Sequence, residues 1–343
     1  MLDLIKEYII KFTDFVCGWP LFTLLIGGGI FLFIYSRALP LRKLGMAVSS
    51  LKMKKKGEGQ VSSFQALMNT ISSTVGMGNI AGVAIALCVG GPGAIFWMWV
   101  SALLGMATKF FEGTLAVMYK GKDDKGVAQG GPMFVLTEGI GWKMKPLAVM
   151  FAFCALFSGL PVMQANQLSE SLYSVILEPL GVPESRWVFL VIGLVIGGIV
   201  SLVIFGGLKR ISQVSSKIVP FMVGFYFLMV LGIMIVYHDR LPAVFESIFK
   251  GAFCWKAGFG AFTAVALTGA RRAMFVNEAG VGTAGMMHGA SMNAEPVREG
   301  LVAMLGPAID SGLVCTLSAI PMIMAGLYST DSVKGLSIAL NTY

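Results

Sequence analysis

Apolar segments separated by short polar loops make up most of this chain, and they restrict its fold more than any other feature. Eight such segments lie near residues 20–35, 62–89, 94–118, 146–176, 187–205, 218–237, from 258 onward and 297–327. Only 13% of the residues are charged, whereas soluble domains carry about 25%. Since the backbone has no water to bond in a lipid core, spans of this kind form helices. The sequence therefore predicts an all-α polytopic membrane protein with about eight transmembrane helices.

The distribution of basic residues predicts how the chain is oriented. The formal net charge is +8, but Lys and Arg lie mainly in loops between the spans, which does not suggest a nucleic-acid-binding surface. The loop after the first span carries seven of them: Arg37, Arg42, Lys43, Lys52, Lys54, Lys55 and Lys56. By the positive-inside rule this loop is cytoplasmic and the N-terminus is external. We expect a multi-pass protein of the plasma membrane that contacts the lipid bilayer and binds no nucleic acid.

Residue types that carry enzyme or metal-site chemistry are sparse in this sequence. The two histidines, His238 and His288, are far apart, and the five cysteines contain no C-x-x-C pair. No nucleophile–base pair or cluster of metal ligands appears at membrane depth. We therefore expect a protein that is not an enzyme and that needs no cofactor besides a coupling ion.

The stretch from Asn69 to Gly93 is apolar enough to cross a bilayer, yet its middle is a poor helix. Four residues with hydroxyl groups come first: Thr70, Ser72, Ser73 and Thr74. The sequence VGMGN, which holds Gly76 and Gly78, follows them. A helix broken here would present free carbonyls to a cation and free N–H groups to a carboxylate. A small zwitterion beside Na⁺ would satisfy both ends, whereas the alternative is an unbroken helix packed through its glycines.

Polar side chains in other spans have two interpretations each. The amides of Gln164, Asn166 and Gln167 either bond neighbouring helices or line a cavity. Asp310 lies within an apolar run, where it either contributes to ion coupling or is protonated and purely structural.

Charged residues near the predicted inner ends of the spans are also ambiguous. Arg271, Arg272 and Glu278 either form an ion-pair gate that seals the inner pathway or lie in cytoplasmic water. Lys109 and Glu112 are three positions apart, so they either pair across one helical turn or extend towards the membrane surface.

Several long motifs resemble those of the alanine or glycine:cation symporter family, also called sodium:alanine symporters. They are VGMGNIAGVAIAL, GGPGAIFWMWVSALLGMATKFFE, GARRAMFVNEAGVGTA and EPVREGLVAMLGPAID. The resemblance implies a LeuT-type inverted-repeat fold of five plus five helices, preceded here by one extra span. Residues 1–343 would form a single transporter domain, with 1–58 as N-terminal helix, extra span and basic loop, 59–237 as the first repeat and 238–343 as an incomplete second repeat. About eight of eleven expected helices would be present, as in a C-terminally truncated member.

The resemblance also implies roles for individual residues. The backbone carbonyls of Ser72 and Val75 would bind Na⁺. Residues of the first break and the fourth span would bind the substrate: Thr74, Gly76, Met77, Gly78, Asn79, Gln164 and Asn166. The seventh span would have a matching break at residues 262–269, which brings Thr263, Ala266 and Gly269 to the substrate.

By this resemblance the protein is expected to carry a small neutral amino acid, alanine or glycine, into the cell with Na⁺ by alternating access. The sequence leaves open whether Na⁺ or H⁺ is the coupling ion. An alternative is a truncated, non-transporting membrane protein that acts as a sensor or scaffold. Flux into proteoliposomes separates the two, because a scaffold gives none at any gradient.

Overall fold

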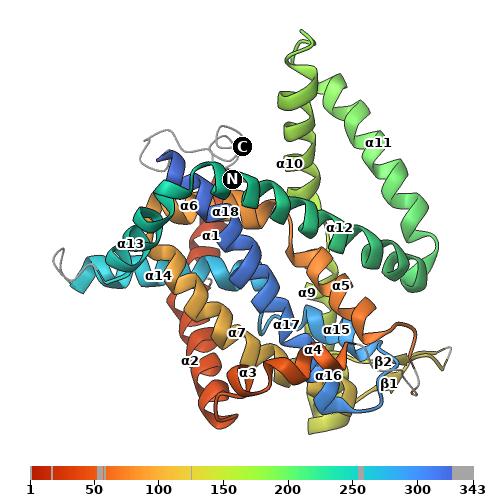
Figure 1. Ribbon diagram of the computed structural model, residues 1–343. Coiled ribbons are helices and arrows are strands. Elements are labelled where there is room, and N and C mark those ends of the chain that lie inside the picture. The colour runs from red at the N-terminus through yellow and green to blue at the C-terminus, as the bar shows by residue number, and fades with distance from the viewer. Residues whose placement is uncertain are drawn as a thin grey trace.

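The computed structural model describes residues 2–16, 18–51, 57, 59–124, 126–253 and 259–326. These residues are almost entirely helical (Figure 1). Within the described ranges the one sheet is a two-stranded antiparallel pair, β1 (Gly121–Lys122) and β2 (Ala128–Gln129). The prediction of an all-α protein is confirmed. Lys52, Lys54, Lys55 and Lys56 of the basic loop lie outside the described residues.

The helices follow one another in three groups along the chain. The first group is α1 (Leu2–Val16), α2 (Trp19–Tyr35), α3 (Leu39–Arg42), α4 (Leu44–Ser50), α5 (Ser63–Thr74), α6 (Met77–Gly90) and α7 (Gly93–Met118). The second is α8 (Pro132–Phe134), η1 (Val135–Ile140), η2 (Trp142–Met144), α9 (Lys145–Ser158), α10 (Val162–Leu172), η3 (Tyr173–Leu177), α11 (Arg186–Ile204), α12 (Gly207–Val236), η4 (His238–Arg240) and α13 (Leu241–Ala252). The third is α14 (Phe259–Asn277), α15 (Thr283–Gly289), α16 (Pro296–Ala303), α17 (Leu305–Pro307), η6 (Ala308–Val314) and α18 (Cys315–Ala325).

Helix α7 is the centre of the packed body. It has 26 residues, so it extends about 39 Å and exceeds a hydrocarbon core of about 30 Å. Ala94, Met98, Ala102 and Met106 recur along it at helical spacing and are buried. Helices α14 and α16 pack along it, and α2, α13 and α15 contact it too. It therefore holds together segments that are far apart in the sequence.

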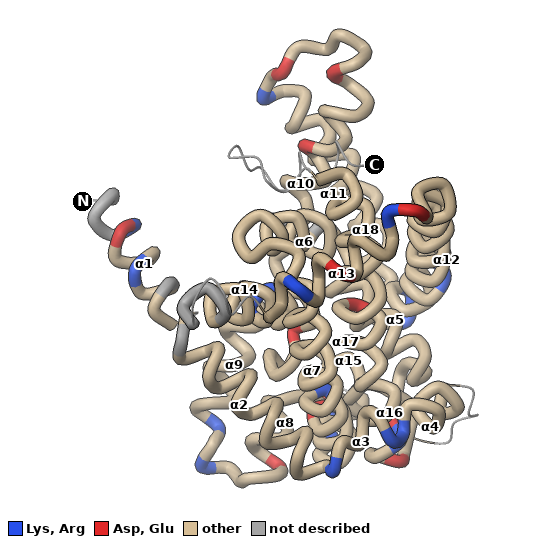
Figure 2. Tube along the Cα trace, turned by 60° about the vertical axis from the view of Figure 1, so that its left-hand side comes forward, with Lys and Arg blue, Asp and Glu red and all other residues tan. Residues whose placement is uncertain are grey.

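Two apolar clusters lie along α7. One joins α6 and α7 to α18, and the other joins α5 and α7 to α16 and α17. Val75 and Gly76, between α5 and α6, lie where the chain passes from one cluster to the other. Figure 2 shows charged residues at both ends of the molecule and also among the packed helices, near α7, α13 and α14.

Helix α16 packs so closely on α7 that glycine is needed at the contact. A Cβ atom at Gly300 would overlap Thr114 Oγ1 and the carbonyl oxygen of Phe110. A Cβ atom at Gly113 would lie 2.6 Å from Ala303 Cβ. Small residues at both positions let the two backbones approach, as is common between membrane helices.

Replacing Gly300 with alanine is expected to destabilise the protein by about 1–3 kcal/mol, because the added methyl group forces α16 away from α7. Gly224→Ala on α12 is the matched control, since a Cβ atom there meets no atom within 4 Å. Thermal unfolding in detergent measures both variants. Equal melting temperatures for the two would contradict the close packing.

The number of membrane spans differs from the sequence prediction. Among the described residues, four helices are long and apolar enough to cross a bilayer: Gly93–Met118, Arg186–Ile204, Gly207–Val236 and Pro296–Ala325. The bent pair of α5 and α6 makes a fifth, and Pro20–Tyr35 is apolar but shorter. The expected fourth span is divided into α9 and α10, because residues 159–161 are not helical. Eight spans and the LeuT-type arrangement remain predictions.

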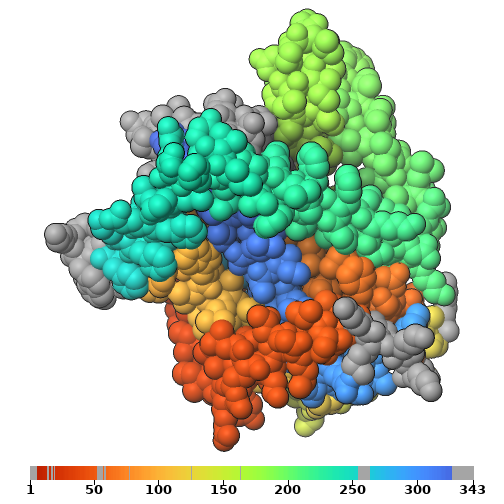
Figure 3. All heavy atoms as spheres, in the orientation of Figure 1, coloured from red at the N-terminus to blue at the C-terminus, as the bar shows by residue number. Residues whose placement is uncertain are grey.

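Helices α10 and α11 form a hairpin that stands away from the body (Figures 1 and 3). Most of their described side chains are exposed. Helix α11 has a mean hydropathy of 2.8 over its most apolar window. Such a surface is typical of a helix in contact with lipid or other apolar groups.

Candidate functional site

The predicted break in the second apolar span is confirmed. Helix α5 ends at Thr74, α6 begins at Met77, and the two axes differ by 48°. Val75 and Gly76 have extended backbone conformations between them. The hydroxyl groups explain part of this. Ser73 Oγ donates to the carbonyl oxygen of Thr70 at 2.8 Å, a local bond that competes with the regular helix.

A cavity of about 400 Å³ lies at this break. Its lining comes from α5 and α6 (Ser72, Ser73, Thr74, Val75, Gly76, Gly78, Ala81, Gly82 and Ile85), from α10 (Gln164 and Gln167), and from α14 and the residue after it (Arg272, Phe275, Val276 and Glu278). Segments up to 206 positions apart in the sequence thus surround one cavity, and its lining includes both polar and apolar side chains.

The structure brings part of the predicted site together. Thr74, Gly76, Gly78 and Gln164 line the cavity, and so do Ser72 and Val75, whose carbonyls are predicted to bind Na⁺. Two predicted substrate residues, Asn79 and Asn166, are not among the lining residues. The side chain of Met77 lies outside the described part. That any of these residues binds substrate or Na⁺ stays a prediction.

The predicted break at residues 262–269 is wrong. Helix α14 runs without interruption from Phe259 to Asn277. Gly269 serves another purpose, since a Cβ atom there would overlap the carbonyl oxygen of Ala94 on α7. Thr263, Ala266 and Gly269 are not among the residues that line the cavity, and their predicted contact with substrate stays a prediction.

The second break lies more than two helical turns later, at residues 278–282. The backbone φ angle is +50° at Glu278, +88° at Gly280 and +97° at Gly282, and α15 begins at Thr283. A left-handed conformation ends a helix, and glycine adopts it without steric cost. Glu278 is the one non-glycine residue of the three, and its Oε2 accepts a hydrogen bond from Thr283 Oγ1 at 2.6 Å. Such backbone strain is frequent at functional sites.

Asn79 links the first break to a buried carboxylate. Its Oδ1 accepts a hydrogen bond from the Gly76 N–H at 2.9 Å, and its Nδ2 donates to Asp310 Oδ1 at 2.5 Å. Asp310 is 1% exposed. Asn79 therefore acts as a bridge between η6 and the start of α6, and the carboxyl group of Asp310 lies one side chain away from the break.

Other charges surround this carboxylate. Lys109 and Glu278 both interact electrostatically with Asp310, the former as an opposite charge and the latter as a like charge. The Lys109 side chain is fully buried, and its Nζ lies 3.9 Å from Glu112 Oε2. Glu112 Oε1 accepts a hydrogen bond from the Gly285 N–H at 2.9 Å. The interpretation that Lys109 extends to the membrane surface is therefore wrong.

The three residues predicted to form a gate lie close to the cavity. Arg272 and Glu278 line it, while Arg271 and Arg272 line a second cavity of about 280 Å³ beside it, together with Thr268. Among the described residues no ion pair joins Arg272 to Glu278. The gate remains a prediction.

Several residues that line the cavity were not predicted as substrate-binding residues from the sequence, although their helical spacing indicates them. Gly82 lies one turn after Gly78 on α6, and Phe275 and Val276 lie one turn after Arg272 on α14. Residues three or four apart share one face of a helix, so each known lining residue predicts the next.

Comparison with known sequences is consistent with this architecture. The sequence model of the sodium:alanine symporter family matches residues 2–342. The chain belongs to the sodium:alanine symporter family. Membership of this transporter family, together with the apolar helices, identifies a multi-pass membrane protein and indicates symport of an amino acid with sodium.

Relatives in this family are similar along most of their length. The sodium/alanine symporter AgcS of Methanococcus maripaludis is 39% identical over 334 residues, which are 95% of this chain and 72% of AgcS. An uncharacterized transporter of Haemophilus influenzae is 37% identical over 97% of this chain and 73% of its own length. The uncharacterized transporter YflA of Bacillus subtilis is 36% identical over 99% of this chain and 72% of its own length.

Proposed function

We propose that this protein carries a small neutral amino acid, alanine or glycine, into the cell together with Na⁺ by alternating access. The observation that carries the proposal is the cavity at the first helix break, where a cationic and an anionic side chain line the same space. The similarity to the sodium/alanine symporter AgcS supports the choice of alanine and sodium.

The lining of the cavity suits a zwitterion with a short side chain. The guanidinium group of Arg272 and the N–H groups at the start of α6 would attract a carboxylate. The carboxylate of Glu278 would attract an ammonium group. Ile85, Phe275 and Val276 supply an apolar wall for a methyl group. Each end of an amino acid would thus meet its complement.

The same break suits a cation. The last carbonyl oxygens of α5 have no partner within the helix, and their dipoles point towards the break. Ser72 and Val75 both reach the cavity there. Asp310 would add a negative charge through Asn79, and we propose that this charge couples Na⁺ binding to the geometry of the break.

Uptake driven by an ion gradient tests the proposal. Purified protein in liposomes is expected to accumulate labelled alanine when Na⁺ is higher outside, because coupled entry of Na⁺ supplies the driving force. Replacing Na⁺ with choline should abolish accumulation, and unlabelled glycine should compete. Alanine uptake that responds to neither a Na⁺ nor an H⁺ gradient would refute coupled transport, and absence of flux at every gradient would favour a sensor or scaffold.

A further inference from the structure

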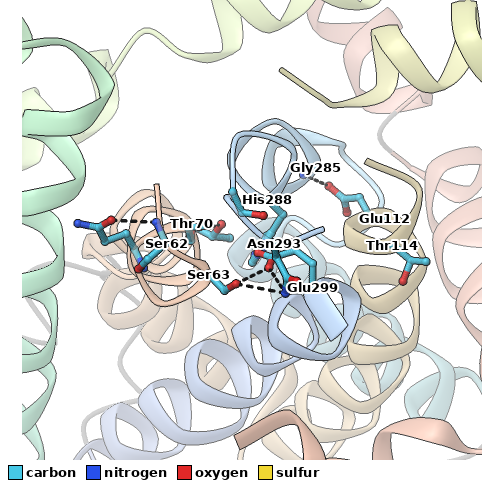
Figure 4. A network of polar contacts seen from close by, with 12 residues as sticks. Ser62, Ser63, Thr70, Glu112, Thr114, Gly285, His288, Asn293 and Glu299 are labelled. Atoms are coloured by element: carbon cyan, nitrogen blue, oxygen red, sulfur yellow. Dashed lines mark hydrogen bonds and ion pairs between the residues drawn. The ribbon is translucent and has the colours of Figure 1, made fainter. Parts of the chain in front are cut away.

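A second polar cluster lies about 18 Å from the break, at the other end of α5. Its centre is the fully buried carboxylate of Glu299 on α16 (Figure 4). Glu299 Oε1 lies 2.7 Å from His288 Nδ1, while Oε2 accepts hydrogen bonds from Ser63 Oγ at 2.5 Å and from Asn293 Nδ2 at 3.1 Å. Ser63 is the first residue of α5, so this carboxylate joins α5 to α15, α16 and the loop between them.

The backbone on both sides reinforces the connection. Gln60 and Val61, just before α5, donate hydrogen bonds to the carbonyl oxygen of Ala290 at 2.9 and 3.3 Å. The Met292 N–H donates to the carbonyl oxygen of Val61 at 2.8 Å. Lys120 Nζ, two residues after the end of α7, donates to the carbonyl oxygen of Ser291 at 2.6 Å. The loop that carries Asn293 is therefore held from two directions.

The two sides of this cluster differ in how firmly they are attached to the body. Glu299 precedes Gly300, the residue through which α16 packs against α7 without room for a Cβ atom. Helix α5, in contrast, is separated from α6 by the break at Val75 and Gly76. A contact at the far end of α5 restricts its angle more than a contact near the break, because it acts on the longer lever arm.

We propose that Glu299, with His288 and Asn293, is a latch that holds the start of α5 through Ser63, and that releasing Ser63 allows α5 to tilt about the break and open the cavity towards the predicted cytoplasmic side. This proposal rests on the proposed function, since it assigns a step of the transport cycle. Ser63 and Glu299 are positioning residues, because neither lines the cavity.

The distribution of donors makes the latch releasable. Two of the three donors of Glu299, His288 and Asn293, belong to the α15–α16 side, and one, Ser63, belongs to α5. When Ser63 moves away, the buried carboxylate of Glu299 keeps its hydrogen bonds from His288 and Asn293, so its charge still has hydrogen-bond partners. Release of the Ser63 side chain therefore breaks one strong hydrogen bond and leaves the charge on Glu299 stabilised. The backbone hydrogen bonds of Gln60 and Val61 to the loop at residues 290–292 precede α5, so the chain between Val61 and Ser63 is where α5 would begin to tilt.

Hydrogen exchange of α5 in the intact protein tests the latch. In lipid nanodiscs, Ser63→Ala is expected to speed exchange of the amides in residues 63–74 by about tenfold, as loss of one hydrogen bond to a charged group predicts. Amides of α7 should be unchanged. Ser63→Thr keeps the hydroxyl group and should restore the slow exchange. Ser50→Ala is the matched control, because Ser50 is also a buried serine but bonds only the Met46 carbonyl of its own helix.

Three results would overturn the latch: unchanged exchange in α5 of Ser63→Ala, an equal increase in α5 and α7, or no restoration by Ser63→Thr. If Ser63→Ala does not accumulate in the membrane, Glu299→Gln gives the same comparison, since it keeps the shape of the side chain but cannot accept from all three donors. Exchange is measured without transport. A parent protein that shows no uptake would therefore refute the proposed function, while the exchange data would still decide the latch.

Discussion

Replacing Gly78 with leucine is expected to abolish alanine uptake while leaving the protein folded in the membrane. A Cβ atom at Gly78 would meet no atom within 4 Å, and Gly78 lines the cavity at the break. The added side chain would therefore enter the space proposed for the substrate. Leucine also favours the helical conformation over glycine by about 1 kcal/mol, so α6 should remain formed.

Uptake and the amount of protein in the membrane must be measured together for this variant. Gly27→Leu on α2 is the matched control, because a Cβ atom at Gly27 also meets nothing within 4 Å but lies away from the cavity. It should transport like the parent. Normal uptake by Gly78→Leu would show that the cavity is not the substrate site.

Replacing Asp310 with asparagine is expected to reduce Na⁺-stimulated uptake by about ten- to a hundredfold, the range of ordinary coupling between two ligands. Asparagine has nearly the shape of aspartate and keeps an oxygen that can accept from Asn79, so the variant removes mainly the charge. Uptake measured against Na⁺ concentration should show a weaker dependence on Na⁺ than in the parent.

A second substitution at this position separates charge from hydrogen bonding. Asp310→Ala also leaves the buried Nδ2 of Asn79 without its acceptor, which costs about 1–3 kcal/mol. It should therefore melt at a lower temperature than Asp310→Asn. Glu246→Gln on α13 is a control for loss of a carboxylate, since Glu246 is exposed and the hydrogen bond from Lys250 lowers its pKa. Full Na⁺ dependence in Asp310→Asn would exclude a coupling role for Asp310.

The first break was predictable because its causes are local. Hydroxyl groups at Ser72, Ser73 and Thr74 bond nearby carbonyls, and Gly76 follows directly. Both effects act over three or four residues, so the order of residues is enough to reveal them. The membrane environment was predictable for a similar reason, since hydropathy adds up along each span.

The position of the second break was not predictable in this way. Gly269 lies within α14 and Gly280 and Gly282 lie after it, but the sequence does not distinguish them, because glycine suits either a turn or a close contact. The carbonyl of Ala94, which lies against Gly269, and the left-handed angles at the other two distinguish these uses. The contact of Gly269 with Ala94 on α7 is a tertiary contact, so it could not be inferred from the order of residues.

By itself, the sequence determined that this chain is a helical membrane protein with a break near Gly76, and its motifs indicated the family. Only the tertiary structure decided which distant groups meet that break. It placed Arg272 and Glu278 on the cavity wall, joined Asp310 to Asn79, and buried Lys109 beside them. It also brought Ser63 to Glu299, 236 positions away. Local patterns report on residues within a few turns, whereas these contacts depend on how whole helices pack around α7.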